Sequence, residues 1–268
     1  MITKIHCLIL FLFIGYRVQA QDTLWHHKKC AVVLTYDDGL DVDIDNVAPA
    51  LDSLGLKATF YVSNYSGTVD ARPDGWRAIA AKGHELGNHT YYHPCLGNLP
   101  GRDFVTPEDD LNNYTVLDVD KEIHVMSTLL KALDGRDART FAYPCGDMKV
   151  RDTFYLDPIK NEFTGARTVR PEMLHIQDVK LYDIGCYTMN GNSGDEMISL
   201  VKQAMSTHTL MVFLFHGVGG GHSLNVSLEA HSQLLHFLKQ HEKEIWVAPM
   251  TEVADYIQRY QSSSKQTK

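Results

Sequence analysis

Two adjacent carboxylates stand at the end of an apolar run near the start of the sequence. Residues 31–36 read AVVLTY, Asp37 and Asp38 follow, and Gly39 comes next. A valine- and leucine-rich run of this length is typical of a buried strand. Asp-Gly is also a common turn after a strand. The stretch alone therefore leaves two interpretations open, a simple turn and a functional pair of carboxylates.

Two histidines four residues apart form a second candidate. His89 and His93 lie in the segment GHELGNHTYYHP, residues 83–94. On one helical turn this spacing directs both imidazoles the same way, which suits chelation of one divalent metal ion. The chain contains 14 histidines, so pairs at this spacing also arise by chance. The histidine pair gains weight only in combination with the carboxylate pair.

Together the two pairs predict a catalytic metal site. Two histidines and one aspartate would leave positions open for water and substrate, as a catalytic metal requires. The second aspartate would then be free to act as a general base. His216 follows the apolar run LMVFLF and precedes a glycine. It could supply an acid at the same rim, although a simple turn also fits.

These residues must be positioned by strands and helices that the apolar patterns predict. Apolar runs predict strands at 31–36, 58–62, 139–143, 163–168, 181–184, 210–215 and 245–248. Amphipathic stretches predict helices at 44–54, 74–82, 118–133, 194–206, 226–240 and 250–260. Such alternation implies parallel strands joined by crossover helices, and six or seven units in one domain favour an α/β barrel. Chemistry in such barrels collects at the carboxyl ends of the strands. Residues 94–116 match neither period and are expected to form a long loop beside this rim.

The N-terminus has the pattern of a secretory signal. Lys4 precedes the apolar run IHCLILFLFIGY, and the small-residue sequence VQA leads to Gln21. This order is typical of a cleaved signal peptide, and the run is short for a membrane span of ~20 residues. We therefore expect a signal at 1–20, a catalytic domain at 21–262 and a polar tail at 263–268. The mature chain is expected to be exported, periplasmic or extracellular, without stable membrane insertion.

Charge and cysteine content exclude two classes of function. The formal net charge is −8, and it becomes −10 once the signal's Lys4 and Arg17 are removed. No basic stripe is present to neutralise phosphates, so nucleic-acid binding is not expected. The mature chain keeps four cysteines, which allow three disulfide connectivities: Cys30, Cys95, Cys145 and Cys186. No pair has CxxC spacing, so a thiolate metal cluster is not indicated.

Four motifs resemble those of the NodB-like polysaccharide deacetylases, carbohydrate esterase family 4. In chain order they read LTYDDG, HELGNHTYYH, RTFAYPCGD and FLFHG. The resemblance runs from about residue 30 to about residue 250, and the first two motifs are the most specific. It implies a single distorted (β/α) barrel of about seven strands. It also implies a hydrolase that removes acetyl groups from a carbohydrate polymer or oligosaccharide with one divalent metal ion, commonly zinc.

The resemblance also assigns roles to individual residues. Asp37 matches the family's catalytic base, and Asp38 matches its metal-binding aspartate. His89 and His93 match the metal-binding histidines, and His216 matches the catalytic acid. A metal-bound water would then act as the nucleophile. Adjacent strand residues point to opposite faces, so this division of labour requires the strand to end or twist at Asp37.

The third and fourth motifs depart from the family pattern. Ala142 stands at the position of an arginine that orients the base, and Cys145 stands at the position of a tyrosine. The backbone N–H of Cys145 could still stabilise the oxyanion, because every non-proline residue has one. Arg167 is a candidate replacement for the arginine, and a structural ion pair is the other interpretation of it. Asp183 is the only trace of the fourth motif.

Two further interpretations stay open at the level of the sequence. The departures motivate a non-catalytic carbohydrate-binding protein that retains the barrel. Within the enzyme class, an O-acetyl esterase of the xylan type is an alternative to an N-deacetylase, because His216 fits either leaving group. The glycine-rich segment GVGGG before His222 is interpreted as a flexible rim loop, because no Lys-Ser/Thr follows it as a phosphate site requires.

Overall fold

The computed structural model describes residues 24–266, so the expected signal at 1–20 lies outside the described residues. Eight strands form its main sheet: β1 (Cys30–Asp37), β2 (Thr59–Val62), β3 (Glu85–Asn88), β4 (Phe141–Ala142), β7 (Ala166–Arg167), β8 (Tyr187–Thr188), β9 (Leu210–Phe215) and β12 (Ile245–Val247). Within the described part of the chain, no helix is long and apolar enough to cross a membrane.

All strand pairs of this sheet are parallel, in the order β7-β4-β3-β2-β1-β9-β8, and β12 pairs with the beginning of β1. The sheet is curled, and the segment that precedes β8 bridges to β7 at the other end of the sheet. There, Thr168 N–H donates to the Ile184 carbonyl at 2.7 Å, and Ile184 N–H donates to the Ala166 carbonyl at 3.0 Å. The prediction of a distorted (β/α) barrel of about seven strands is confirmed.

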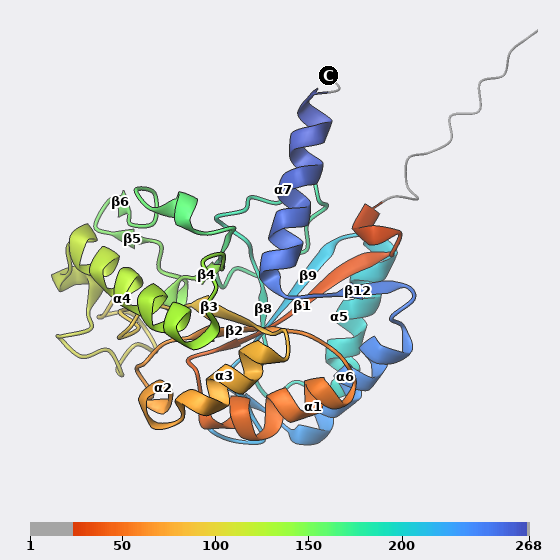
Figure 1. Cartoon of the computed structure of the whole chain (residues 1–268), viewed down its shortest axis with the longest axis horizontal. Helices are drawn as coiled ribbons and strands as arrows, with labels where there is room; N and C mark the ends of the chain where they lie inside the picture. Colours follow the sequence, from red (N-terminus) through yellow and green to blue (C-terminus); the bar gives the residue numbers. More distant parts are fainter. Residues whose placement is uncertain (1–23, 267–268) are drawn as a thin grey trace, which may run out of the picture.

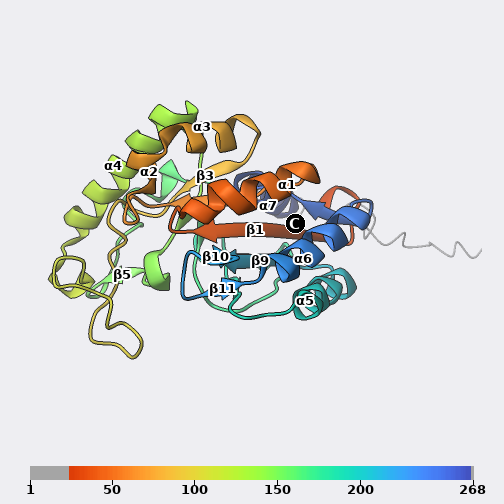
Figure 2. The ribbon, with the colours of Figure 1, turned by 90° about the horizontal axis from the view of Figure 1, so that it is seen from below.

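The helices lie around the outside of the curled sheet (Figure 1 and Figure 2). They are α1 (Ala48–Ser53), α2 (Thr68–Ala71), α3 (Pro73–Ala81), α4 (Val116–Asp134), α5 (Gly194–Thr207), α6 (Leu228–Gln240) and α7 (Met250–Gln266). A short π-helix, η2 (Asp43–Val47), precedes α1. Short elements complete the chain: 3-10 turns η3 (Leu111–Asn113), η4 (Pro144–Gly146) and η5 (Lys160–Glu162), a hairpin of β5 (Lys149–Val150) and β6 (Thr153–Phe154), and the pair β10 (Gly217–Val218) and β11 (Asn225–Val226).

Strand β1 is buried on both faces, which explains its nearly continuous apolar sequence. Val32, Leu34 and Tyr36 join the apolar cluster that includes residues of α5 and α6. Ala31 and Val33 join a second cluster with residues of α7. The alternation places residue 37 on the same side as residues 31 and 33, away from α5 and α6.

Three parts of the predicted fold need correction. No strand was predicted at residues 85–88, which form β3, so His89 and His93 follow a strand instead of sharing one helical turn. Asn88 of β3 is buried, and its side chain donates to the Ile123 carbonyl at 2.8 Å. The strand predicted at 181–184 contains a turn, in which Asp183 N–H donates to the Lys180 carbonyl at 2.9 Å, and the strand lies at Tyr187–Thr188. Helix α7, predicted to end at residue 260, runs on to Gln266.

Candidate active site

The two aspartates stand where β1 ends, and the backbone separates their side chains. Asp37 is the last strand residue, and Asp38 has a φ of 76°. Gly39 has a φ of 65°, and a Cβ there would lie 3.0 Å from Cγ1 of Val62. The left-handed turn thus releases Asp38 from strand alternation, so both carboxylates can face the same space. Both are buried, with 3% and 8% of their surface exposed.

The two histidines lie at the carboxyl end of β3 and in the loop that follows it, not on a helix. His89 comes directly after β3, and its Nδ1–H donates to the Ala142 carbonyl at 2.8 Å. His93 has a φ of 59°, and its Nδ1 lies 3.6 Å from Sγ of Cys95. Each contact uses Nδ1 as the donor, because a carbonyl and a disulfide sulfur have no proton to give. The Nε2 lone pair of each ring is therefore available to a metal.

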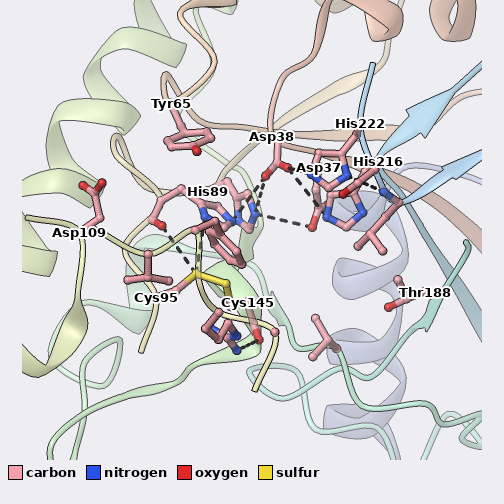
Figure 3. A pocket seen from close by; sticks show the side chains of 18 of the residues that line it. Asp37, Asp38, Tyr65, His89, Cys95, Asp109, Cys145, Thr188, His216 and His222 are labelled. Atoms are coloured by element: carbon pink, nitrogen blue, oxygen red, sulfur yellow. Dashed lines mark hydrogen bonds and ion pairs between the residues drawn. A yellow bond between two sulfur atoms is a disulfide. The ribbon is translucent and has the colours of Figure 1, made fainter. Parts of the chain in front are cut away.

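One oxygen of Asp38 meets both Nε2 atoms. Asp38 Oδ1 lies 3.7 Å from His89 Nε2 and 3.5 Å from His93 Nε2 (Figure 3). This buried oxygen has no hydrogen-bond partner among the described residues. An unpaired buried carboxylate oxygen between two imidazole lone pairs is the donor set that a divalent cation requires. These three residues therefore fit one metal ion, with positions left for other ligands.

Burial sets the charge state of this group. It lowers the pKa of His93 to about 4 and that of His89 well below its usual value, so both rings are neutral at pH 7. It raises the pKa of Asp38, and nearby His216 opposes that shift. A buried carboxylate beside neutral imidazoles lacks a compensating cation, and a bound metal ion would supply the missing charge.

The structure places Arg167 against Asp37. Its Nη2 donates to Asp37 Oδ2, and its Nη1 donates to the Thr168 carbonyl at 3.2 Å. The guanidinium is fully buried and lies 5.0 Å from the centre of the Tyr61 ring. The other oxygen of Asp37, Oδ1, has no partner within residues 24–266. One side of the carboxylate is thus held by a cation, and the other can accept a proton.

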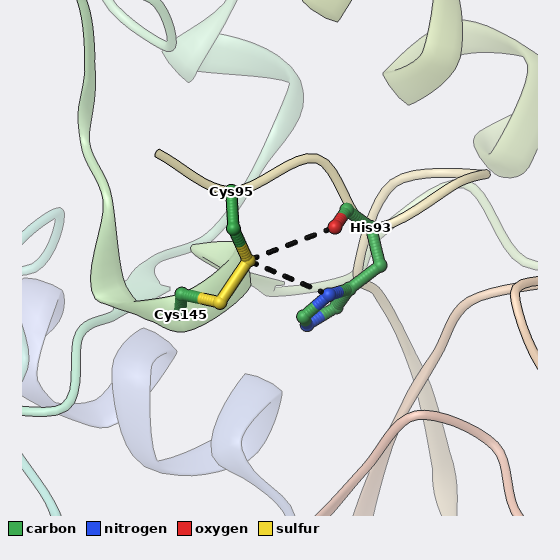
Figure 4. Close-up of side chains that lie close together, drawn as sticks. All are labelled: His93, Cys95 and Cys145. Atoms are coloured by element: carbon green, nitrogen blue, oxygen red, sulfur yellow. Dashed lines mark hydrogen bonds between the residues drawn. A yellow bond between two sulfur atoms is a disulfide. The ribbon is translucent and has the colours of Figure 1, made fainter. Parts of the chain in front are cut away.

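Cys145, which stands at the tyrosine position of the third motif, forms a disulfide. Cys145 is bonded to Cys95, next to His93 (Figure 4). Cys145 has a φ of 54° within η4, and this turn follows directly after β4. Both sulfurs lie within 4.8 Å of a ring nitrogen of His93, but as a disulfide they offer no thiolate to a metal. Only one pair is bonded among the described residues, because Cys30 and Cys186 are buried free thiols.

His216 approaches the group from β9, and His222, which the sequence interpretation left in a flexible rim loop, lies beside it. The Nε2 atoms of both rings lie 3.9 Å from Asp38 Oδ2. The rings stack with centroids 4.7 Å apart and an interplanar angle of 16°. The three glycines at 219–221 were the sequence signal that could have indicated this position of His222. They adopt positive φ angles, which let the chain reverse and return toward His216. Asp183 does not reach the group and pairs with Arg170 at 3.1 Å instead.

A cleft of about 570 Å³ opens above these residues. Exposed aromatic side chains line it, with 59% of Tyr65, 55% of Tyr92 and 54% of Phe104 accessible to solvent. Phe104 lies on the loop after Cys95. Arg102 of this loop donates to Asp147 Oδ2 at 2.8 Å and so holds the loop in place. The long loop expected at 94–116 is present apart from η3 and does border the candidate site.

Comparisons with known proteins point to one family. Residues 26–156 match the family model described as polysaccharide deacetylase. Gellan lyase from Bacillus sp. is 25% identical over 90% of this chain and 10% of its own length. Peptidoglycan-N-acetylglucosamine deacetylase from Bacillus cereus is 35% identical over 27% of this chain and 26% of its own length. Chitin deacetylase from Colletotrichum lindemuthianum is 37% identical over 28% of this chain and 32% of its own length. The chain thus spans a third or less of each of these relatives.

Solved structures agree on the fold. A Mycobacterium smegmatis protein assigned to the polysaccharide deacetylases superposes with a TM-score of 0.61 at 17% identity, over 87% of this chain and 92% of that chain. The Xyl-CE4 domain of a multidomain xylanase from the hindgut metagenome of Trinervitermes trinervoides gives a TM-score of 0.54 at 17% identity, over 85% and 90%.

Proposed function

Because residues 26–156 match the polysaccharide deacetylase family model, we propose that the chain is an exported, metal-dependent hydrolase of this family that removes acetyl groups from a carbohydrate polymer or oligosaccharide. The observation that carries the proposal is the convergence of three sets of groups in one cleft. These are the donor set of Asp38, His89 and His93, the Asp37–Arg167 ion pair, and His216.

Asp38, His89 and His93 would hold the metal ion. When bound, a divalent ion lowers the pKa of a coordinated water and polarises a carbonyl oxygen. Zinc is the metal we propose, because one carboxylate and two imidazoles are ligands that it favours. The chain contributes fixed ligands here, since the contact of His89 Nδ1 with the Ala142 carbonyl sets the ring's orientation.

Asp37 would act as the general base. Its free oxygen, Oδ1, accepts a proton from water, while Arg167 holds Oδ2 and favours the ionised carboxylate. His89 Nε2 lies 3.6 Å from Asp37 Oδ2, so the base stands next to the metal ligands. This arrangement gives Arg167 the orienting role of the arginine that is missing at position 142.

His216 would protonate the leaving amine or alcohol. It lies on the opposite side of Asp38 from His89 (Figure 3), and its Nε2 is 3.9 Å from Asp38 Oδ2. The backbone N–H of Cys145 would donate to the oxyanion, and the disulfide to Cys95 fixes its turn. Donors of this kind are typically worth ~2.7–4 kcal/mol of transition-state stabilisation each.

Polymers of N-acetylglucosamine are the first substrates we propose. Two of the relatives are named as deacetylases of peptidoglycan N-acetylglucosamine and of chitin. An amide needs leaving-group protonation more than an ester does, because an amine anion is the poorer leaving group. Export is supported by the secretory pattern at the N-terminus and by the disulfide, because disulfides persist mainly in oxidising compartments.

The test is acetate release from three substrates: chitin oligomers, peptidoglycan and acetylated xylan. We expect release from an N-acetylglucosamine substrate, its loss after chelation and its return after zinc is added. Release from xylan alone would assign an O-acetyl esterase. No release from any substrate by the zinc-loaded protein would favour the non-catalytic carbohydrate-binding protein.

Two matched variants separate the roles of the aspartates. Asp37→Asn should keep bound zinc and lose turnover, since an amide cannot accept the proton. Asp38→Asn should lose most of the zinc together with turnover, because it removes one of three protein ligands. The reverse pattern of metal content would show that the two roles are exchanged.

A further inference from the structure

His222 differs from the metal-ligating histidines in which nitrogen faces the site. The backbone N–H of Leu224 donates to His222 Nδ1 at 3.0 Å. This nitrogen must therefore accept, so the neutral ring carries its proton on Nε2. His89 has the opposite arrangement, in which Nδ1–H donates and the Nε2 lone pair faces the site. His222 thus presents an N–H donor where His89 presents a metal ligand.

His222 lines the cleft, and its Nε2–H has no hydrogen-bond acceptor in range within residues 24–266. Asp38 Oδ2 is 3.9 Å away, which is too long for a direct hydrogen bond. The side chain of His222 is 31% exposed, against 14% for His216, so it stands nearer the mouth of the cleft. A group bound beside the reacting atoms would meet His216 first and His222 next.

The loop is shaped to hold this ring in place. Gly219, Gly220 and Gly221 have φ angles of 73°, 121° and 84°, which favour glycine. A Cβ at Gly221 would lie 2.9 Å from both methyl carbons of Val42. The Gly220 N–H donates to Asn225 Oδ1 at 2.9 Å, which ties the loop to β11. The segment is therefore a built turn rather than a flexible rim.

We propose that His222 is a substrate-binding residue whose Nε2–H donates a hydrogen bond to an oxygen of the sugar ring beside the acetylated position. The inference rests on the proposed function, because it takes the cleft to hold an acetylated sugar. It assigns His222 neither metal binding nor proton transfer. The ring selects ligands that carry a hydroxyl or ring oxygen next to the acetyl group, and the stacked His216 remains the acid.

Direct binding tests the proposal without turnover. Zinc-loaded Asp37→Asn protein is the parent, and tri-N-acetylchitotriose and an acetylated xylotriose are the probes, measured by isothermal titration calorimetry. In this parent, His222→Phe keeps an aromatic ring to stack on His216 but has no N–H. His222→Gln gives up the stacking ring but keeps an amide N–H of similar reach. Zinc content is measured for every variant.

We expect His222→Phe to weaken binding of the preferred probe about five- to tenfold, the value of one hydrogen bond, at unchanged zinc content. His222→Gln should bind within about twofold of the parent. Parent-like binding by His222→Phe, or equal losses in both variants, would overturn the proposal. Loss of zinc from His222→Phe would overturn it too, by making His222 a metal ligand.

The two proposals fail separately. If the protein with Asp37 intact releases no acetate while the parent binds a probe and the variants behave as expected, the proposed reaction fails and the assignment of His222 stands. If acetate is released and His222→Phe binds normally, only the assignment of His222 fails. A parent that binds neither probe contradicts both.

Discussion

Among single residues, Arg167 is the one whose position changes the interpretation most. The third motif lacks its arginine, and the sequence left Arg167 open between a replacement and a structural ion pair. It lies fully buried, with its Nη2 on the carboxylate proposed as the base. In the proposed mechanism, β7 would therefore supply the orienting contact that the resemblance places on β4.

Replacing Arg167 tests this role. Arg167→Ala should lower kcat/KM at least tenfold and move the acidic limb of the pH–rate profile to higher pH, because a cation favours the ionised form of a neighbouring carboxylate. Arg167→Lys should restore the acidic limb and only part of the rate, because lysine carries the charge without the two-donor fork. Acetate release from pH 4 to 8 is the measurement.

Truncation of a buried ion pair also costs stability, roughly 3–5 kcal/mol. Circular dichroism must therefore confirm that the Arg167 variants are folded at each pH. A folded Arg167→Ala enzyme whose pH profile matches that of the wild type would reduce the pair to a structural role.

At the scale of elements, one loop closes the site from the side of β3 and β4. The Cys95–Cys145 disulfide spans 50 residues and joins the loop after His93 to η4. Arg102 adds a second tie to Asp147, and the Leu96 N–H donates to the same carboxylate at 2.8 Å. The loop and the proposed oxyanion donor are therefore joined by a covalent bond and by side-chain hydrogen bonds.

The disulfide should matter for both stability and rate. The Cys95→Ser/Cys145→Ser double variant should lose roughly 2–5 kcal/mol of unfolding free energy, because the cross-link restricts the unfolded chain. Its kcat should fall several-fold at unchanged zinc content, because Cys145 loses its fixed turn. Asp147→Asn is the matched control, which weakens the Arg102 tie and keeps the disulfide.

Denaturant unfolding and acetate release measure the two effects. A reductant should reproduce the loss in the wild type and have no effect on the double variant. Wild-type kcat in the double variant would show that the disulfide serves stability alone.

Over the whole molecule, buried neutral histidines make stability depend on pH. Burial lowers the pKa of His231 to about 4, and its Nε2 accepts from the Tyr36 hydroxyl at 2.7 Å. It also lowers the pKa of His84 to about 4, and His84 Nδ1 accepts from the Ala58 N–H at 3.2 Å. Protonation would place His84 Nδ1–H against the Ala58 N–H and would bury a positive charge on His231.

The sign follows from linkage. Below pH ~6.5 these histidines bind protons in the unfolded chain but not in the folded chain. Their contribution to the free energy of unfolding is therefore complete above that pH and is lost as the pH falls toward 4. For His231 the loss is at most ~3 kcal/mol, at ~1.4 kcal/mol per pH unit. Urea unfolding of metal-free protein from pH 7.5 to 4.5 measures it.

His231→Leu supplies the control for this loss. It should be less stable than the wild type at pH 7.5, and the difference should shrink as the pH falls. A constant difference across the range would mean that His231 is protonated in the folded protein as readily as in the unfolded chain.

Local sequence pattern was enough to predict several parts of this protein. The apolar runs of β1 and β9 are uninterrupted and buried on both faces, so their positions and the polar residues at their ends could be predicted. The types and order of Asp37, Asp38, His89, His93 and His216 were sufficient to suggest metal chemistry. Strand β3 was missed because its sequence, ELGN, has no apolar period, and buried hydrogen bonds hold its polar side chains.

The distant residues that complete the site could be identified only from the folded chain. Arg167 meets a carboxylate 130 residues away, because the curl of the sheet brings β7 across the barrel from β1. Cys95 is bonded to Cys145, and His222 stacks on His216, because turns with positive φ bring these residues together. Such contacts depend on strand order and loop reversal, and no short sequence period encodes either of them.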